Sequence, residues 1–230
     1  GIPQLEGELA GKIDAKWWRV LIAKFFGGFL ANFSGLALGR EGPSIQLGAM
    51  VGKGIGKVLK RGKTEERYLL TCGASAGLAA AFHAPLAGVM FALEEVHKHF
   101  SAPLLISVMT SSIAADYLMS SILGMAPVFS FNIHGTLPTQ YYWMVIILGI
   151  ILGLLGAFYN KALLFVQSLY NHSKHLNNYT KLLIPFILAG ILGFTVPQLL
   201  GSGDTLVDLL IEGKLTMSLI LLLLAGKFLF

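Results

Sequence analysis

Long apolar segments recur from one end of the chain to the other, and they limit its possible folds more than any other feature. Only 13% of the 230 residues are charged and 55% are hydrophobic, whereas a soluble domain carries about 25% charged residues. Because about 20 apolar residues suffice to cross a bilayer as a helix, the sequence predicts an all-α integral membrane protein. The apolar segments are residues 20–38, 45–55, 68–94, 104–123, 143–169, 182–200 and 215–230.

Lysine and arginine residues gather in clusters, which orient the segments in the membrane. Cytoplasmic loops carry an excess of Lys and Arg, and the loop 124–142 has neither. We therefore place this loop outside and the clusters inside, and we attribute the net charge of +5 to cytoplasmic loops rather than to nucleic-acid binding. The clusters are Lys12, Lys16 and Arg19; Lys53, Lys57, Lys60, Arg61, Lys63 and Arg67; Lys98 with His97 and His99; and Lys174 with Lys181.

This topology leaves too few residues for two full crossings between residues 20 and 53. One crossing takes about 20 residues, so the return cannot be a complete helix. We expect an outward helix to about Leu38, a non-helical dip into the membrane at the sequence GREGP (39–43), and a short helix after it. The same count applies to residues 68–96, where Pro85 interrupts the apolar run, and predicts two short helices meeting inside the bilayer.

Glycine pairs at GxxxG spacing predict close helix packing, because this spacing lets two backbones approach each other in lipid. The pairs are Gly48–Gly52, Gly52–Gly56, Gly73–Gly77 and Gly149–Gly153.

Both ends of the chain suggest an internal piece of a longer protein. Residue 1 is not Met, and the chain stops inside an apolar run. A single cysteine, Cys72, excludes an internal disulfide bond.

The dip at residues 39–43 carries the chemistry that this sequence can support. Non-helical backbone at membrane depth is tolerated where it is buried or lines a watery cavity. Pro43 fits the first turn of a helix, and we expect the free N–H groups of Ser44 and Ile45 to form an anion site. Glu41 would compete with the anion and leave when protonated, as a gate. The alternative is that Arg40 and Glu41 only neutralise each other.

Other charged residues in apolar segments have simpler interpretations. Glu94 and Glu95 either end a helix at the interface or, at a different depth from Glu41, extend a proton route to it. Lys24 is expected to pair with Glu6 or Glu8. His83 is expected to form a hydrogen bond at the helix break, and Asp116 is weaker evidence for a site because it fits a place near the outer surface.

Enzyme motifs are missing from the sequence. An intramembrane protease would need a Ser/His pair or two Asp residues, and Asp116 and Asp208 stand in no recognisable motif. No set of Cys or His residues has metal-ligand spacing. We therefore predict that the protein is not an enzyme and uses no metal or cofactor.

Four stretches resemble the CLC family of chloride channels and chloride/proton exchangers. They are GIPQLEG (1–7), WWRVLIAKFFGG (17–28), GREGPSIQLG (39–48) and GASAGLAAAFHAPLAGVMFALEEV (73–96). The resemblance covers most of residues 1–100; from about residue 140 it rests on hydropathy and segment order.

The resemblance implies roles for particular residues. Glu41 stands at the gating glutamate and Glu95 at the internal proton-transfer glutamate, which favours exchange over a passive channel. The anion-binding motif is Arg40, Glu41, Gly42, Pro43 and Ser44, and Gly1, Ile2 and Pro3 match the loop end of a first anion motif. Gln4 stands where some members have an acid.

The resemblance also implies an architecture and partners. The family is a homodimer of inverted repeats in the membrane, so we expect the remainder of the first repeat at 1–135 and the start of the second at 136–230. Chloride and protons would be the transported ions, in a bacterial inner membrane. A passive, proton-gated chloride channel stays the alternative.

Overall fold

The computed structural model describes residues 2–124, 138–172, 177–211, 213 and 215–230, and these residues form helices and no strand. The predicted all-α class is therefore confirmed. The predicted repeat boundary at 135–136 lies outside the described residues.

The α-helices are α1 (Ile2–Leu9), α2 (Trp17–Phe33), α3 (Glu41–Val58), α4 (Lys63–Phe82), α5 (Pro85–Phe91), α6 (Ala102–Leu123), α7 (Tyr142–His172), α8 (Asn178–Thr195), α9 (Asp204–Ile211) and α10 (Met217–Leu229). A π-helical turn (Ala92–His97) follows α5, and short 3₁₀ turns lie at Thr139–Tyr141 and Pro197–Leu199.

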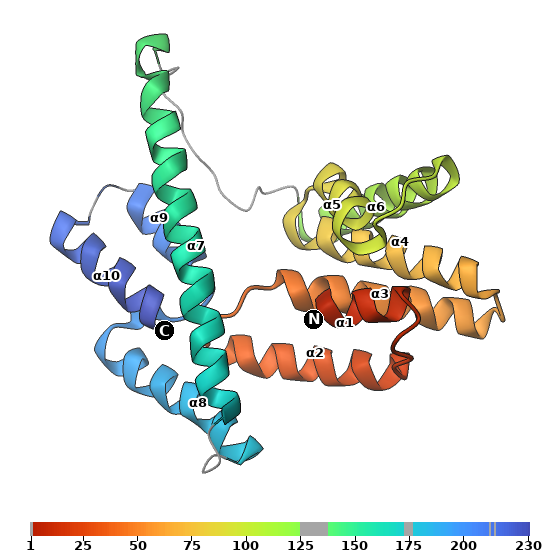
Figure 1. Cartoon of the computed structure of the whole chain (residues 1–230), viewed down its shortest axis with the longest axis horizontal. Helices are drawn as coiled ribbons and strands as arrows, with labels where there is room; N and C mark the ends of the chain where they lie inside the picture. Colours follow the sequence, from red (N-terminus) through yellow and green to blue (C-terminus); the bar gives the residue numbers. More distant parts are fainter. Residues whose placement is uncertain (1, 125–137, 173–176, 212, 214) are drawn as a thin grey trace. The chain divides into compact units, whose positions relative to one another are not determined.

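Two compact units make up the chain: Gly1–Phe33 with Leu38–Phe129, and Ser34–Ala37 with Ser130–Phe230. In the first unit α3 packs along α4, and α4 packs against α6 (Figure 1). Its core has one cluster around Leu5, Ile45 and Met50, and a second around Val89 and Leu104. In the second unit the Lys227 ammonium holds the turn before α9 by donating to the Leu199 carbonyl at 2.9 Å.

Close packing of α3 on α4 depends on the predicted glycines. A Cβ atom on Gly48 would collide with the Gly73 carbonyl, and one on Gly77 would collide with the Ser44 carbonyl. The GxxxG prediction is thus confirmed for this helix pair. For Gly149 and Gly153 it stays a prediction, because no described atom lies within 4 Å of a Cβ built at either position.

Both predicted helix breaks occur, although the helices beside them differ from expectation. α2 ends at Phe33 rather than near Leu38, and α3 is 18 residues long, about 27 Å at 1.5 Å per residue. The prediction of a short helix was wrong because α3 begins two residues before Pro43 and continues into residues that the charge pattern assigned to a cytoplasmic loop.

At the second break, α4 ends at Phe82, His83 has a left-handed φ of 51°, and α5 starts at Pro85. Here only α5 is short, since α4 has 20 residues.

Membrane crossing is supported by helix length and composition. Among the described residues, Ala102–Leu123 and Thr139–His172 are long and apolar enough to span a bilayer, and Tyr179–Thr195 and Met217–Leu229 are shorter apolar helices.

Candidate functional site

The first turn of α3 is the centre of the candidate site. Arg40 is the N-cap, and its carbonyl accepts a hydrogen bond from the Ser44 N–H at 3.1 Å. The expectation that the Ser44 and Ile45 N–H groups are free was therefore wrong, because the helix starts earlier than the proline suggested. The N–H groups without an intrahelical acceptor are those of Arg40, Glu41 and Gly42, since Pro43 has none.

The Glu41 side chain folds back over Gly39. Its Cδ lies 3.0 Å from the place a Cβ on Gly39 would occupy, and its Oε2 lies closer still. Any side chain at position 39 would displace the carboxylate. The Glu41 side chain is exposed in this chain, so the carboxylate sits at the positive end of α3 with room to move.

Arg40 is directed to an aromatic ring rather than to its neighbour. Its guanidinium carbon lies 5.3 Å from the centre of the Phe82 ring, at the end of α4, a distance at which a cation is attracted to the ring face. Among the described residues the ion pairs do not include Arg40 with Glu41. This geometry does not support the alternative that the two charges only neutralise each other.

The remaining residues of the motif fix the start of α3 between two neighbours. A Cβ on Gly28 of α2 would lie 3.9 Å from the Pro43 Cβ, and the Ser44 carbonyl packs on Gly77 of α4. A Cβ on Gly42 would meet no described atom within 4 Å, so the N–H end of α3 is open beside it. This end is an arrangement that can bind an anion.

Glu94 and Glu95 lie in the π-helical turn after α5, and both are exposed. The turn closes with a hydrogen bond from the Lys98 N–H to the Leu93 carbonyl at 3.0 Å. Single π turns are frequent at functional sites, and the sequence pattern did not predict one here.

The structure does not bring Glu41 and Glu95 together. At the start of α3, Arg40 contacts Phe82 of α4. In the π turn, His97 contacts Thr71 of α4. Phe82 and Thr71 are separated by about 16 Å along α4, at 1.5 Å per residue. The neighbours of the two acids, Arg40 and His97, therefore contact α4 at positions 11 residues apart, and a proton route between Glu95 and Glu41 stays a prediction.

His97 makes a contact that sequence reasoning missed, since its Nδ1 lies 2.9 Å from the Thr71 hydroxyl. The same hydroxyl lies 2.9 Å from the Arg67 carbonyl, to which it can donate. With its one proton used there, the hydroxyl accepts from His97 Nδ1–H, and this is the tautomer that we expect. Burial, followed by the positive charges of His99 and Arg67, lowers the pKa of His97. The only feature of the sequence that could have drawn attention to His97 was its position two residues after Glu95.

His97 lines a cleft of about 600 Å³ with mostly basic walls. Charged and titratable side chains around it are Glu6, Lys12, Arg67, His97, Lys98 and His99. Glu6 and Lys98 form an ion pair at 3.5 Å across this cleft. Its field favours anions and disfavours a proton on His97.

Ile2 and Pro3 are helical rather than part of a loop, since α1 spans Ile2–Leu9. Gly1 lies outside the described residues. Proline is readily accommodated in a first helical turn, which explains why this motif end can be helical.

The polar residues near the second break are joined to each other. His83 Nδ1 lies 3.2 Å from Asp116 Oδ1 and 3.4 Å from the Ser120 hydroxyl. The prediction that His83 forms a hydrogen bond at the break is confirmed. Asp116 is only a quarter exposed and belongs to this cluster.

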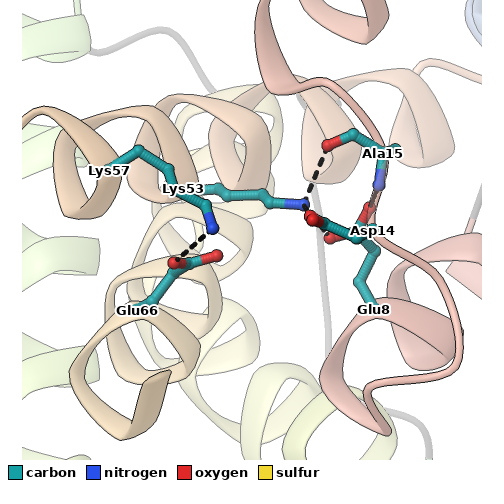
Figure 2. A network of polar contacts seen from close by, with 6 residues as sticks. All are labelled: Glu8, Asp14, Ala15, Lys53, Lys57 and Glu66. Atoms are coloured by element: carbon teal, nitrogen blue, oxygen red, sulfur yellow. Dashed lines mark hydrogen bonds and ion pairs between the residues drawn. The ribbon is translucent and has the colours of Figure 1, made fainter. Parts of the chain in front are cut away.

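The predicted partners of Lys24 are engaged elsewhere. Glu6 pairs with Lys98, and Glu8 pairs with Lys53 (Figure 2). Lys53 is 2% exposed, so within its basic cluster it is a buried, paired charge. No group of three or more His, Cys, Asp or Glu side chains that would suit a metal ion occurs in the described part of the chain.

Comparison with known proteins gives consistent matches. The family described as "Voltage gated chloride channel" matches residues 1–230. The chain is 37% identical over 234 residues to the H(+)/Cl(-) exchange transporter ClcA of Vibrio parahaemolyticus serotype O3:K6 (strain RIMD 2210633), and 36% identical to the ClcA of Vibrio campbellii (strain ATCC BAA-1116). Each alignment covers 99% of this chain and 50% of the relative, so the chain spans about half the length of these curated relatives.

Solved structures agree on the fold. A slow cyanobacterial Cl-/H+ antiporter matches with a TM-score of 0.89 and 35% identity, over 100% of this chain and 54% of that one. A CLC-type fluoride/proton antiporter matches with a TM-score of 0.80 over 100% of this chain and 58% of that one. At 21% identity the second match concerns the fold alone.

Proposed function

The chain belongs to the voltage-gated chloride channel family, and on that premise we propose that it forms part of a membrane transporter that exchanges chloride for protons. The relatives at 35–37% identity are named as such exchangers or antiporters. The observation that carries the proposal is the Glu41 carboxylate folded over Gly39 at the open N–H end of α3.

Glu41 acts in this proposal as a gate that competes with the anion. The free N–H groups of Arg40, Glu41 and Gly42 attract either chloride or the carboxylate. Protonation removes the charge of the carboxylate and with it this attraction, so the anion enters. Arg40 holds the turn against Phe82, and Gly42, Pro43 and Ser44 shape the start of the helix.

Glu95 acts as the inner proton-transfer group. A proton passes between groups within hydrogen-bond reach or through one water. Glu41 and Glu95 lie on different elements, α3 and the π turn, and in this proposal water carries the proton between them. His97 is neutral above its lowered pKa. It therefore adds no charge to the cleft that it lines, and the basic residues of that cleft attract anions.

The assembled protein is proposed to be a homodimer in a bacterial inner membrane. Membership of this family and the bacterial relatives support this assignment. Gly1, Ile2 and Pro3 would contribute the end of the first anion motif.

Reversal potentials of the full-length protein in planar bilayers test the proposal. With a fixed chloride gradient, an added pH gradient must shift the reversal potential if protons are exchanged for chloride. A potential that follows chloride alone would establish the passive, proton-gated channel instead.

A further inference from the structure

Lys53 is a buried ammonium whose three protons are all used. It donates to the Glu8 carboxylate, to Asp14 Oδ1 at 2.8 Å and to the Ala15 carbonyl at 2.8 Å (Figure 2). An ammonium has three donors and no acceptor, so this set is complete. All three partners lie in α1 or in the connection from α1 to α2, whereas Lys53 belongs to α3.

Glu8 closes the network into a ring. One carboxylate oxygen faces Lys53, and the other accepts the Ala15 N–H at 2.6 Å. The Glu8 side chain is 5% exposed and that of Asp14 is 81% exposed. The Lys53 hydrogen bond lowers the pKa of Asp14, so the Asp14 carboxylate keeps its charge near neutral pH.

One face of α1 packs along α3. Gln4 accepts from Gln46 Nε2 at 3.1 Å, Leu5 packs on Ile45 and Met50, and Glu8 meets Lys53. Residue numbers rise together in both helices, so the helices run in the same direction. Their N-termini, which begin at Ile2 and Glu41, therefore lie at the same end of the contact.

Lys53 sits at the opposite end of this contact from the proposed anion-binding residues. Gln46 is about 7.5 Å along α3 from Glu41, and Lys53 is about 10 Å further. A helix transmits a displacement at one end to the other because its backbone is hydrogen-bonded throughout. Without Lys53, the C-terminal end of α1 loses its polar attachment to α3, while Gln4 and Leu5 still hold its N-terminal half against α3, so α1 can tilt about that contact.

We propose that Lys53 is a positioning residue of the anion site, which holds α1 against α3 and so fixes the Ile2–Pro3 helix start relative to Glu41. The inference rests on the proposed function for its chloride readout. It assigns to a buried lysine a role in anion affinity that its place in a basic cluster did not suggest.

Chloride titration calorimetry on the full-length protein tests this role. Lys53→Met removes the charge and keeps the chain length, Lys53→Arg is the conservative rescue, and Lys57→Met is the matched control. Lys57 is on the next turn of α3, is 49% exposed and pairs with Glu66 of α4 at 3.2 Å without touching α1 (Figure 2). We expect Lys53→Met to raise the Kd for chloride about tenfold, which is 1.4 kcal/mol, while Lys53→Arg restores it and Lys57→Met leaves it unchanged.

The Tm distinguishes a positioning role of Lys53 from a general loss of protein stability. A Lys53→Met protein with the Tm of the control and a raised Kd supports the proposal, and the same Tm with an unchanged Kd overturns it. Should Lys53→Met not fold, the double variant Lys53→Met/Glu8→Gln, which leaves no unpaired buried charge, decides by the same two outcomes.

Hydrogen exchange of the α1 amides distinguishes this inference from the proposed function. A wild-type protein that binds no chloride refutes the proposed function and the role in anion affinity. The hydrogen exchange still tests whether Lys53 anchors α1 in that case. Faster exchange at residues 2–9 in Lys53→Met than in Lys57→Met supports the anchoring, and equal exchange overturns it.

Discussion

Glu41 is the residue where the backbone and the proposed chemistry meet. Its carboxylate lies over Gly39, its own N–H is one of the free donors of α3, and Arg40 is turned away toward Phe82. A carboxylate without an ion pair, at the positive end of a helix, can be replaced by an anion. In the proposed function, protonation of Glu41 is therefore the step on which coupling depends.

Replacing Glu41 by Gln is expected to separate chloride movement from proton movement. The amide has the same shape but no charge to compete with the anion and no proton to exchange. In liposomes containing the full-length protein, chloride efflux should continue while proton uptake falls to the level of protein-free vesicles. Proton uptake that persists in this variant would remove Glu41 from the proton path.

Replacing Glu95 by Gln is expected to stop proton movement while chloride still passes. Glu94→Gln is the matched control, because Glu94 is exposed in the same π turn. The measurement is proton uptake against chloride efflux in the same vesicles. Equal proton fluxes in the two variants would contradict the assignment to Glu95.

His97 should titrate below its ordinary pKa of about 6.5, because burial and the nearby His99 and Arg67 disfavour its charged form. The unfolded chain then binds this proton more readily than the folded protein, so His97 lowers stability as the pH falls below about 6.5 and has no such effect above it. Imidazole NMR should show the Nδ1–H tautomer. His97→Gln should weaken the loss of Tm between pH 7 and 5, and an unchanged loss would contradict this prediction.

At the scale of elements, the contact between α3 and α4 fixes the position of the proposed gate. Gly48, Gly73 and Gly77 let the two backbones touch, and Ser44 of the candidate site is part of that contact. The start of α3 is therefore held by backbone packing rather than by long side chains, which keeps the free N–H groups in one place.

Gly73→Ala should destabilise the protein by about 1–3 kcal/mol, the usual cost of overpacking. Its Cβ would collide with the Gly48 carbonyl, and backbone cannot move aside easily. Gly27→Ala in α2 is the control, since no described atom lies within 4 Å of a Cβ there, and it should be neutral or stabilising by up to about 1 kcal/mol. Thermal unfolding in detergent compares the two; equal Tm values would show that the contact is looser than described.

At the scale of the whole molecule, apolar side chains remain exposed on α5 and α6, among them Leu86, Met90, Ile106 and Ile113. In a membrane, lipid or a second subunit covers such surfaces. The proposed homodimer requires a partner subunit in addition to lipid.

Light scattering of the full-length protein, corrected for bound detergent, is expected to give twice the mass of one chain. A closed twofold assembly is the commonest form for oligomers of identical chains. A mass of one chain at micromolar concentration would contradict the dimer and leave the fold and the ion site unaffected.

The sequence by itself determined the membrane class, the two helix breaks and the glycine contact of α3 with α4. Each depends on local chemistry: apolar length, a proline that cannot continue a helix, and residues without a side chain. The family motifs likewise marked Glu41 and Glu95, and the roles of these two residues stay predictions.

Only the tertiary structure decided which charges meet. Lys53 pairs with Glu8, 45 residues away, and Glu6 pairs with Lys98 instead of Lys24. The hydrogen-bond partner of His97 is Thr71, 26 residues away. Partners so distant in the chain cannot be read from spacing, because a buried charge takes whichever opposite charge the packing of helices brings to it.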